Sequence, residues 1–343
     1  MEIYFNKYNI GKLMEDKKDI KNKNKELKEE KRRIKRKIEI TYAKEGERVR
    51  LDKFLSFVLH EKYNIEITRN NIQDKILKED IFVIGNEKII KIKPSYILKP
   101  GDKIIYIEYE EKEKVIPDDL KKCVYSNIIY EDEDIIVINK PKGIIVHSGN
   151  NTSITLVDIL KEKYTLYGEN GREGIVHRLD KNTSGLMIVA KTKMAYENLI
   201  NTFKKREIIK KYRGIVFGIV AEKEGIIDMP IGRDLKNRHK MKVRSDGKNA
   251  KTKFKVISYI ENEYTYLDMQ IYTGRTHQIR VHMAKIGHPL VGDDIYTRKE
   301  NEWKIQGQVL QSYFLEFHHP LTNQKMKFEI EENEEIRKII GKD

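Results

Sequence analysis

Hydrophobic side chains first recur at helical spacing after residue 47. They fall at i, i+3, i+4, i+7 and i+8, which is one face of a helix, at Leu51, Phe54, Leu55, Val58 and Leu59. A second short helix is predicted after Thr68, which can cap its start and whose buried face would hold Ile72 and Ile76. Strands are predicted at Ile81–Ile84 and Ile104–Ile107, bounded by Gly-containing turns.

Beyond residue 120, apolar runs typical of strands outnumber helical patterns. The predicted strands are Ile135–Ile138, Gly143–Val146, Leu186–Ala190, Ile215–Val220, Phe254–Ile257 and Tyr266–Ile271. The predicted helices are 154–163, 193–206 with Thr192 as N-cap, and 276–286 with Thr276 as N-cap and Gly287 at the end. Because strands follow one another without regular βαβ alternation, the pattern favours an α+β fold with a mixed or antiparallel sheet.

Two hydrophilic segments lack any apolar stripe and divide the chain. Residues 15–40 are nearly all charged or amide and predict a mobile arm or a solvent-exposed helix. Residues 110–120 are acidic, contain Pro117 and read as a linker. The predicted organisation is therefore a charged N-terminal extension (1–46), a small α+β domain (47–109), a linker (110–120) and a larger domain (121–343).

The net charge of +14 is concentrated in short segments. Residues 1–40 carry 14 Lys/Arg against 8 Asp/Glu, and residues 233–255 carry 10 against 2, so these two segments account for the whole excess. Confined basic segments suit a polyanionic partner. Lysine-rich coding is the alternative explanation.

Other classes are excluded or disfavoured by what the sequence lacks. The single cysteine, Cys123, excludes an intrachain disulfide and fits a reducing cytoplasm. We expect no membrane span and no signal peptide. His277 and His282 are five residues apart, a poor match to helix-borne zinc ligands, and no glycine-rich phosphate loop occurs. We therefore expect neither metal nor cofactor.

Three stretches of the small domain resemble an S4 domain, an RNA-binding module. They are RLDKFLSF (50–57), TRNNIQDKI (68–76) and KPSYILKPGDKI (93–104). The resemblance implies that RNA lies against the basic helical face, with Arg50, Arg69 and Lys75 as contacts. An unrelated small α+β domain with a basic helix is the alternative.

Residues 174–191 predict a strand, a polar turn and a second strand. Asp180 opens the turn and is flanked by Arg178 and Lys181, cations that would stabilise its charge. Asp and Asn also favour turns for local hydrogen-bonding reasons, so these residues alone leave a purely structural turn equally open.

Four separated motifs resemble those of the RluA-type RNA pseudouridine synthases, over residues 130–330. In chain order they are INKPKGIIVHSGN (138–150), HRLDKNTSGLMIVAKT (177–192), KKYRGIVFG (210–218) and TGRTHQIRVHMAKIGHPLVGDDIY (273–296). One departure is Leu310-Gln311-Ser312, where related sequences often read Leu-His-Ala. The resemblance implies an enzyme that breaks the N-glycosidic bond of a uridine and rejoins the uracil through carbon.

Carried over residue by residue, the resemblance implies Asp180 as catalytic carboxylate, Tyr212 as active-site aromatic and Arg280 as the basic partner of Asp180. The chemistry fits, since a guanidinium can hold a carboxylate charged and aimed. Without the resemblance, Tyr212 would read as an ordinary strand aromatic and Arg280 as a phosphate contact or surface charge.

RNA contacts are predicted around the same motifs. Arg178 is the side chain expected to insert into the RNA when the target nucleotide is extruded. We also predict contacts from His177, Lys140 and Arg275 and from four cations of the 232–255 segment, Arg233, Arg238, Lys240 and Lys242. For that segment a solvated basic hairpin is the alternative.

The resemblance favours large-subunit (23S) ribosomal RNA as substrate, because RluA-type enzymes with an S4 domain usually act there. A tRNA substrate is the second choice. A non-catalytic RNA-binding or ribosome-assembly protein is the rival class, and an S4-bearing methyltransferase lacks its nucleotide loop here. We expect a cytoplasmic monomer, and whether Asp180 attacks the sugar or the base is open.

Overall fold

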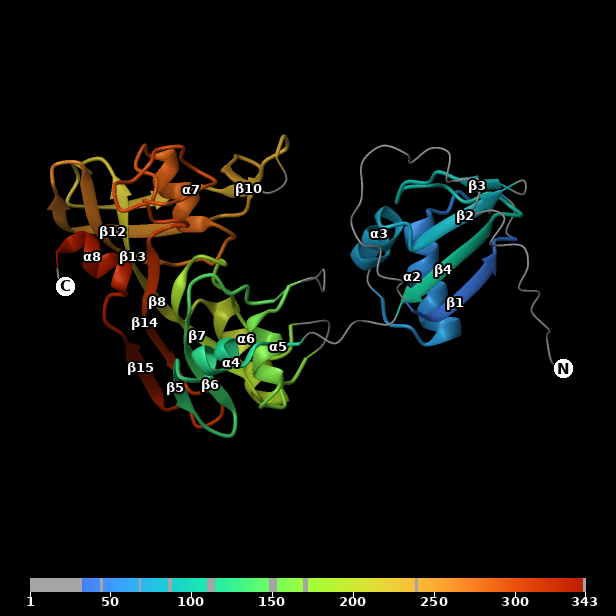
Figure 1. The fold of residues 1–343 in the computed structure, drawn as a ribbon, viewed down its shortest axis with the longest axis horizontal. Helices are drawn as coiled ribbons and strands as arrows, with labels where there is room; N and C mark the ends of the chain where they lie inside the picture. The colour runs from blue at the N-terminus through green and yellow to red at the C-terminus, as the bar shows by residue number, and fades with distance from the viewer. Residues whose placement is uncertain are drawn as a thin grey trace. The chain divides into compact units, whose positions relative to one another are not determined.

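The chain forms two compact units, Met1–Glu113 and Lys114–Asp343. The computed structural model describes residues 33–43, 46–67, 69–85, 88–109, 115–147, 153–168, 172–237 and 240–341. Each unit has its own sheet and its own buried core, and each is described by itself (Figure 1). Within these ranges, no helix combines the length and the apolar character that crossing a membrane requires.

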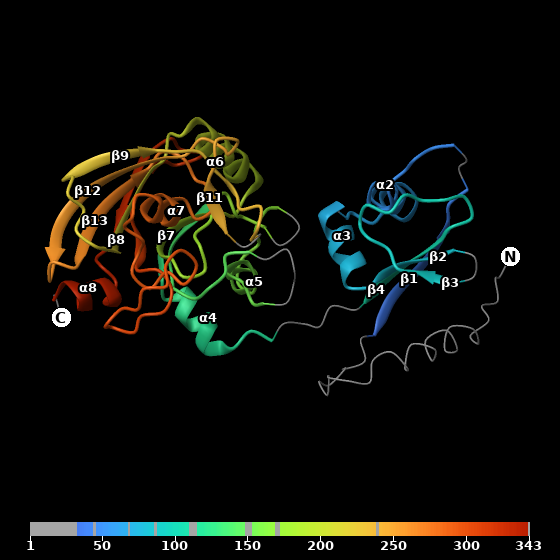
Figure 2. The same ribbon diagram turned by 90° about the horizontal axis from the view of Figure 1, so that it is seen from above.

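The first unit is a four-stranded antiparallel sheet with two helices on one face (Figure 2). The strand order is β1-β4-β2-β3. The elements are β1 (Ile34–Thr41), α2 (Leu51–Tyr63), α3 (Arg69–Leu77), β2 (Ile81–Gly85), β3 (Lys88–Ile90) and β4 (Lys103–Tyr109). Both predicted helices and both predicted strands are present, although Thr68, the expected cap of α3, lies outside the described residues.

The core of this unit follows from the two periodicities of its sequence. The apolar stripe of α2 and two isoleucines of α3 face every second residue of the strands, so both sides of the interface are apolar. The buried residues include Leu51, Leu55, Leu59, Ile72, Ile76, Ile38, Ile81, Val83, Ile104 and Tyr106.

The predicted boundary of the N-terminal extension at residue 46 is wrong. Ile34–Thr41 form β1, which pairs with β4 as an edge strand of the first unit. An edge strand buries little, and here only Ile38 is fully buried among exposed charges, so its alternation was hidden in the basic segment. The rest of the predicted extension, residues 1–32, lies outside the described residues.

The second unit is built on a nine-stranded mixed sheet. Its order is β5-β6-β7-β14-β8-β13-β12-β9, with β15 also paired to β14, and every pairing is antiparallel except β7 with β14. The strands are β5 (Ile128–Glu131), β6 (Ile135–Lys140), β7 (Ser184–Ala190), β8 (Ile209–Phe217), β9 (Glu224–Asp228), β12 (Lys251–Ile260), β13 (Tyr264–Ile271), β14 (Leu310–His318) and β15 (Lys325–Glu329). A separate two-stranded ribbon joins β10 (Ile231–Arg233) to β11 (Met241–Val243).

Helices cover the two faces of this sheet, so its central strands are buried on both sides. In β6, Ile136 and Ile138 pack in the cluster that holds α4, α5 and α7, whereas Ile135 and Val137 pack in the cluster that holds α6. The helices are α4 (Asp118–Tyr125), α5 (Leu156–Lys161), α6 (Lys193–Lys205), α7 (Gln278–Lys285) and α8 (Glu334–Ile340). The predicted α+β class with a mixed sheet is confirmed.

Four local predictions for this unit are wrong, each for an identifiable reason. Gly143–Val146 make one isolated bridge instead of a strand, and β8 ends at Phe217 because Gly218 takes a left-handed conformation. The expected linker 110–120 ends early, since Ile116 is buried and α4 begins at Asp118. The strand expected before Asp180 is reduced to a single bridge at Ile175.

Candidate active site

Asp180 sits in the loop that leads into β7, and a buried lysine fixes that loop. Lys140 is fully buried, and its Nζ donates to the carbonyl oxygens of Pro141 (2.7 Å), Ile144 (3.0 Å) and Lys181 (3.2 Å). Burial lowers the pKa of Lys140 to about 7, and the charge of Asp180 acts in the opposite direction. The prediction that Lys140 contacts RNA is therefore wrong, because its ammonium is enclosed by backbone.

Arg280 joins Asp180 to a second carboxylate, Asp293. Its Nε and Nη2 donate to the two oxygens of Asp293 at 2.7 and 2.8 Å, and its Nη1 donates to Asp180 Oδ2 at 3.3 Å. Burial would lower the pKa of Arg280, but hydrogen bonds and charge from Asp293, with help from Asp180, outweigh burial and raise it. The bidentate pair locks the guanidinium plane, so one edge stays directed at Asp180.

Asp293 is the functional residue that sequence reasoning missed. Its side chain is fully buried, and besides Arg280 it accepts the backbone N–H groups of Ile295 and Tyr296. The residue lay within the quoted 273–296 motif, next to Gly292, but nothing local separated it from the exposed Asp294 beside it. Only the fold shows which of the two aspartates faces Arg280.

His277 lies beside the carboxylate, and Tyr296 packs against the His277 ring. The Tyr296 hydroxyl accepts the backbone N–H of Met241 and lies 2.8 Å from His277 Nδ1. The Tyr296 hydroxyl then donates its hydrogen bond to Nδ1, so the proton of the neutral His277 ring is assigned to Nε2. Nε2 lies 3.9 Å from Asp180 Oδ2. Burial lowers the pKa of His277 despite the opposing charge of Asp180.

His277 also corrects a predicted cap. It occupies the N-cap position of α7 in a left-handed conformation (φ 56°) and makes no side-chain cap bond, whereas Thr276 was expected there. Non-glycine residues adopt this conformation only at a cost, and such strain is commonest at functional sites. The turn thus places the His277 ring in the wall of a cavity that Asp180 also lines.

Tyr212 lies on β8, opposite Ser312 of β14, and is buried in the same cavity. Burial raises the pKa of Tyr212 strongly, the Ser312 hydrogen bond opposes this, and the charge of Asp180 adds to it. The phenol is thus neutral at physiological pH. The unusual Leu310-Gln311-Ser312 stretch opens β14, and its serine supplies this contact.

Asp180, Tyr212 and Arg280, predicted from three separate motifs, line one cavity of about 510 Å³. Asp180 keeps 18% of its side chain exposed there, whereas Arg280 keeps 4%. Polar and charged residues of its wall include Arg178, Asp180, Lys204, Arg206, Lys210, Tyr212, Arg275, His277 and Arg280. A reacting group in this cavity therefore meets one anchored carboxylate within a mainly cationic surround.

Of the predicted RNA contacts near the cavity, Arg178 is exposed, and Arg275 is held by a 3.0 Å bond from its Nε to the Asn249 carbonyl. His177 lines the cavity but has a structural role, since its Nε2 accepts the Ile188 N–H (2.9 Å) and its ring packs on Phe203. Burial lowers the pKa of His177 to about 3, so the ring is neutral and offers phosphates no charge.

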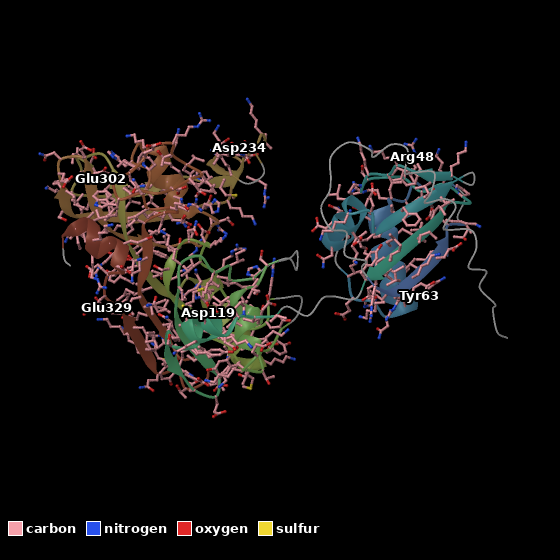
Figure 3. All side chains as sticks on the ribbon, viewed as in Figure 1. Arg48, Tyr63, Asp119, Asp234, Glu302 and Glu329 are labelled. Atoms are coloured by element: carbon pink, nitrogen blue, oxygen red, sulfur yellow. The ribbon has the colours of Figure 1, made fainter. Side chains whose placement is uncertain are left out.

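The β10–β11 ribbon carries the other predicted contacts of this unit. Arg233 and Lys242 are exposed, Lys240 is half-buried, and Arg238 lies outside the described residues. Asp234, at the turn after β10, marks this ribbon in Figure 3. The described part of the 232–255 segment is thus the β10–β11 ribbon followed by strand β12, and its contact with RNA stays a prediction.

In the first unit, the buried carboxylate of Asp52 binds two of the side chains predicted to contact RNA, Arg50 and Arg69. Asp52 accepts hydrogen bonds from Arg50 (2.9 and 3.1 Å), Arg69 (3.2 Å) and Gln73 (2.7 Å). The hydrogen bond from Arg50 is the main reason that the pKa of Asp52 is far below its usual range. Both guanidiniums remain about half exposed, so they are fixed side by side at the surface, while Lys75 lies over the Tyr106 ring.

Asp132, Asp134 and His319 form a cluster whose ligand atoms lie within 4.8 Å of one another. His319 Nδ1 accepts the N–H groups of Leu321 and Thr322, so Nε2 carries the proton and donates to Asp132 at 3.0 Å. Both ring nitrogens are thereby used. The arrangement ties two turns together and leaves no histidine lone pair for a metal.

Comparison with known proteins places the cavity in context. Residues 134–285 match a family model described as RNA pseudouridylate synthase. A Bacillus subtilis (strain 168) protein named as an uncharacterized RNA pseudouridine synthase is 38% identical over 307 residues, covering 88% of this chain and 97% of that protein. Ribosomal large subunit pseudouridine synthase D of Vibrio cholerae is 37% identical over 277 residues, covering 77% and 83%.

A solved structure, Human RNA Pseudouridylate Synthase Domain Containing 1, superposes with a TM-score of 0.50 at 26% identity, covering 60% of this chain and 82% of that chain. The sequence similarity covers 97% of the Bacillus subtilis relative and 83% of the Vibrio cholerae relative. The chain belongs to the RNA pseudouridine synthase family.

Proposed function

We propose that this protein converts specific uridines of large-subunit ribosomal RNA into pseudouridine, with Asp180 as the catalytic carboxylate. The observation that carries the proposal is the chain of contacts Asp293–Arg280–Asp180 at the wall of the cavity. A carboxylate anchored by a rigid guanidinium is aimed before the substrate arrives, which is how positioned groups lower a barrier.

The proposed reaction balances without a redox partner. The N1–C1′ bond of the uridine breaks, a C5–C1′ bond forms, N1 gains a proton and C5 loses one. Asp180 can act either by attacking or deprotonating the sugar or by adding to the base, and both routes need it ionised. Arg280 stabilises that charge and would also hold the carboxylate during the rearrangement.

Tyr212 is proposed to form the face against which the uracil lies. Its ring lines the cavity with Asp180, and its neutral phenol can donate or accept a proton near the moving base. His277, with Nε2 directed at Asp180, is the other group placed to exchange a proton in the cavity.

A uridine stacked in folded RNA cannot reach Asp180, so it must be extruded. Arg178 is exposed at the cavity and is our candidate for the side chain that enters the RNA. The cations of the β10–β11 ribbon, Arg233, Lys240 and Lys242, are proposed to follow the backbone, and Arg275 to line the entrance.

The first unit is proposed to be an S4-like RNA-binding domain. Its support is the exposed Arg50–Arg69 pair, pre-arranged by Asp52, together with the resemblance of its three sequence stretches. Guanidiniums that are already oriented lose less entropy on binding phosphate than free ones.

Ribosomal RNA is preferred to tRNA because several relatives at 35–40% identity are named ribosomal large subunit pseudouridine synthase D. A monomer acting in the cytoplasm is part of the proposal.

The deciding experiment measures tritium release from RNA labelled at uridine C5, using transcripts of 23S rRNA and of tRNA in parallel. Release from the rRNA supports the proposal. Release from tRNA alone would show that the substrate is tRNA and not rRNA. Binding without release supports a non-catalytic RNA-binding protein. Asp180→Asn should abolish release while RNA affinity stays within roughly tenfold, about 1.4 kcal/mol. Wild-type turnover by this variant would refute the role of Asp180.

A further inference from the structure

Lys210 is a buried cation in the wall of the cavity that contains Asp180. The residue is only 9% exposed, and it precedes Tyr212 by two residues on β8, so both side chains point from the same face of the strand. Among the residues that the structure describes, no oxygen accepts a hydrogen bond from its ammonium and no carboxylate forms an ion pair with it. Its contact is the Phe203 ring, 5.0 Å away.

Lys140 provides the internal comparison. It is fully buried, and three carbonyl oxygens surround its ammonium, so its partners belong to the fold. The ammonium of Lys210 instead lies beside open cavity, where a Cβ added at Gly274 would be 3.8 Å from it. Burying a charge without a partner is costly, so a partner supplied by a ligand is the physical reason to keep it.

The chemistry of the substrate identifies that partner. Uracil and ribose are neutral, and the anionic groups of RNA are its phosphodiesters. Tyr212 and Lys210 stand two residues apart on one strand, about 6.6 Å along it. With the base against Tyr212 and the sugar at Asp180, Lys210 lies where the adjoining sugar–phosphate would pass.

We propose that Lys210 binds the phosphate next to the target uridine and thereby holds the extruded nucleotide in register with Asp180. This inference rests on the proposed function and adds a substrate-binding residue to it. Lys210 would be a positioning residue that contacts the substrate away from the reacting bond.

The charge that this role needs is available at physiological pH. Burial lowers the pKa of Lys210 to about 8, so the ammonium is still mostly protonated near pH 7. The ionisable groups around it are His177, which burial keeps neutral, and the cationic residues of the cavity wall, Arg178, Lys204, Arg206 and Arg275. An incoming phosphate at Lys210 would meet a mainly cationic wall, with the carboxylate of Asp180 in the same cavity.

The test compares three variants of the full chain: Lys210→Met, Lys210→Arg and Lys211→Met. Lys211 precedes Tyr212 directly, points to the other face of β8 over the Phe314 ring, and gives the same change in net charge. On an RNA hairpin whose target uridine has been mapped, Lys210→Met should lose roughly ten- to hundredfold in single-turnover rate, measured with enzyme in excess over RNA but below saturation. Lys210→Arg should retain most of the rate, and Lys211→Met should match wild type.

The decisive arm removes the anion as well as the cation. Two hairpins each carry one neutral methylphosphonate, the first immediately 5′ and the second immediately 3′ of the target uridine. The wild-type enzyme should act on such a hairpin about as slowly as Lys210→Met acts on the unmodified hairpin. One of the two should cause no further loss in Lys210→Met. Independent, multiplying losses at both positions would overturn the proposal.

A stability measurement separates ligand binding from a structural role. Without RNA, Lys210→Met should be at least as stable as wild type, because an unpaired buried charge has been removed. A clear loss of stability would overturn the proposal. If the proposed function itself were wrong, wild type would release no tritium from unmodified RNA, while the effect of Lys210→Met on hairpin affinity, read by fluorescence anisotropy, would still decide the phosphate contact.

Discussion

At the scale of single residues, the cavity is organised by how buried charges are paired. Arg280 uses one edge to bind Asp293 and leaves the other for Asp180, so two carboxylates share one guanidinium with different purposes. Asp293 is fully buried and saturated, whereas Asp180 is partly open to the cavity. The buried carboxylate gives the exposed one its geometry.

Asp293→Asn should therefore damage both stability and turnover. Removing one partner of a buried ion pair leaves an uncompensated charge, which costs about 3–5 kcal/mol. We expect a loss of that size in the free energy of unfolding by urea, and a fall in kcat larger than any rise in KM, because Arg280 is no longer aimed.

The matched control is Asp294→Asn. Asp294 lies next in the chain, 3.8 Å from Arg280 Nη2, but its side chain is 70% exposed. It should stay within about 1 kcal/mol of wild type. Equal effects of the two substitutions would contradict the assignment of Asp293 as the orienting carboxylate.

His177 predicts a pH dependence of stability. Its folded pKa of about 3 lies below the unfolded value near 6.5, so between these values the unfolded chain binds a proton that the folded chain does not. The stabilisation is complete above pH 6.5 and declines as pH falls toward 3. Between pH 7.0 and pH 5.5, the free energy of unfolding should fall less in His177→Gln than in wild type. The difference between the two falls should be at most about 1.4 kcal/mol per pH unit. Parallel losses would contradict the neutral state of the His177 ring.

At the scale of elements, the site depends on the parallel contact of β7 with β14. Ser184 and Gly185 pair with Gln311 and Ser312, and Ser312 also pairs with Tyr212 of β8. Gly185 has φ +114°, and a Cβ there would lie 2.6 Å from the Ser312 nitrogen and 2.7 Å from its carbonyl carbon. Strand β14 thus joins the Asp180 loop to the Tyr212 strand only because residue 185 has no side chain.

Gly185→Ala should push β14 away from β7. We expect a loss of roughly 3 kcal/mol or more, combining backbone strain with the steric clash, and a large fall in turnover as Tyr212 shifts. Gly287→Ala is the control, since Gly287 also has positive φ (93°) but no atom within 4 Å of the added Cβ. It should cost only about 1 kcal/mol in urea unfolding. Similar losses at the two sites would show that the clash at Ser312 is relieved cheaply.

At the scale of the whole molecule, the chain consists of two units with separate cores. The proposed chemistry lies within the second unit, where Asp180, Tyr212, Arg280 and Lys210 share one cavity. The first unit presents the half-exposed guanidiniums of Arg50 and Arg69, both bound to Asp52. We expect the second unit to carry catalysis and the first to add RNA affinity.

Deleting residues 1–113 should leave a folded enzyme that still releases tritium from a short hairpin. Its affinity for long rRNA should fall, and the slope of log affinity against log salt concentration should flatten, since fewer phosphates are neutralised. The measurement is RNA binding over a salt series for the full and shortened chains. An unchanged slope would argue against an RNA role for the first unit.

The sequence by itself determined the fold class, most helices and central strands, and the three residues proposed for catalysis. Helical and strand periodicities are local, so α2, α6 and β7 could be predicted from the spacing of apolar residues. The local pattern failed to predict β1, because this edge strand buries few residues among its charges. It also failed to predict the start of α7, where His277 has a left-handed backbone conformation.

Only the tertiary structure decided what each charged group does. Lys140 and Lys210 look alike in the sequence, yet one is enclosed by three carbonyls and the other faces an open cavity. Asp180 and Arg280 are 100 positions apart and meet at 3.3 Å. The role of a buried charge depends on which groups replace its water, and those groups come from parts of the chain that only folding brings together.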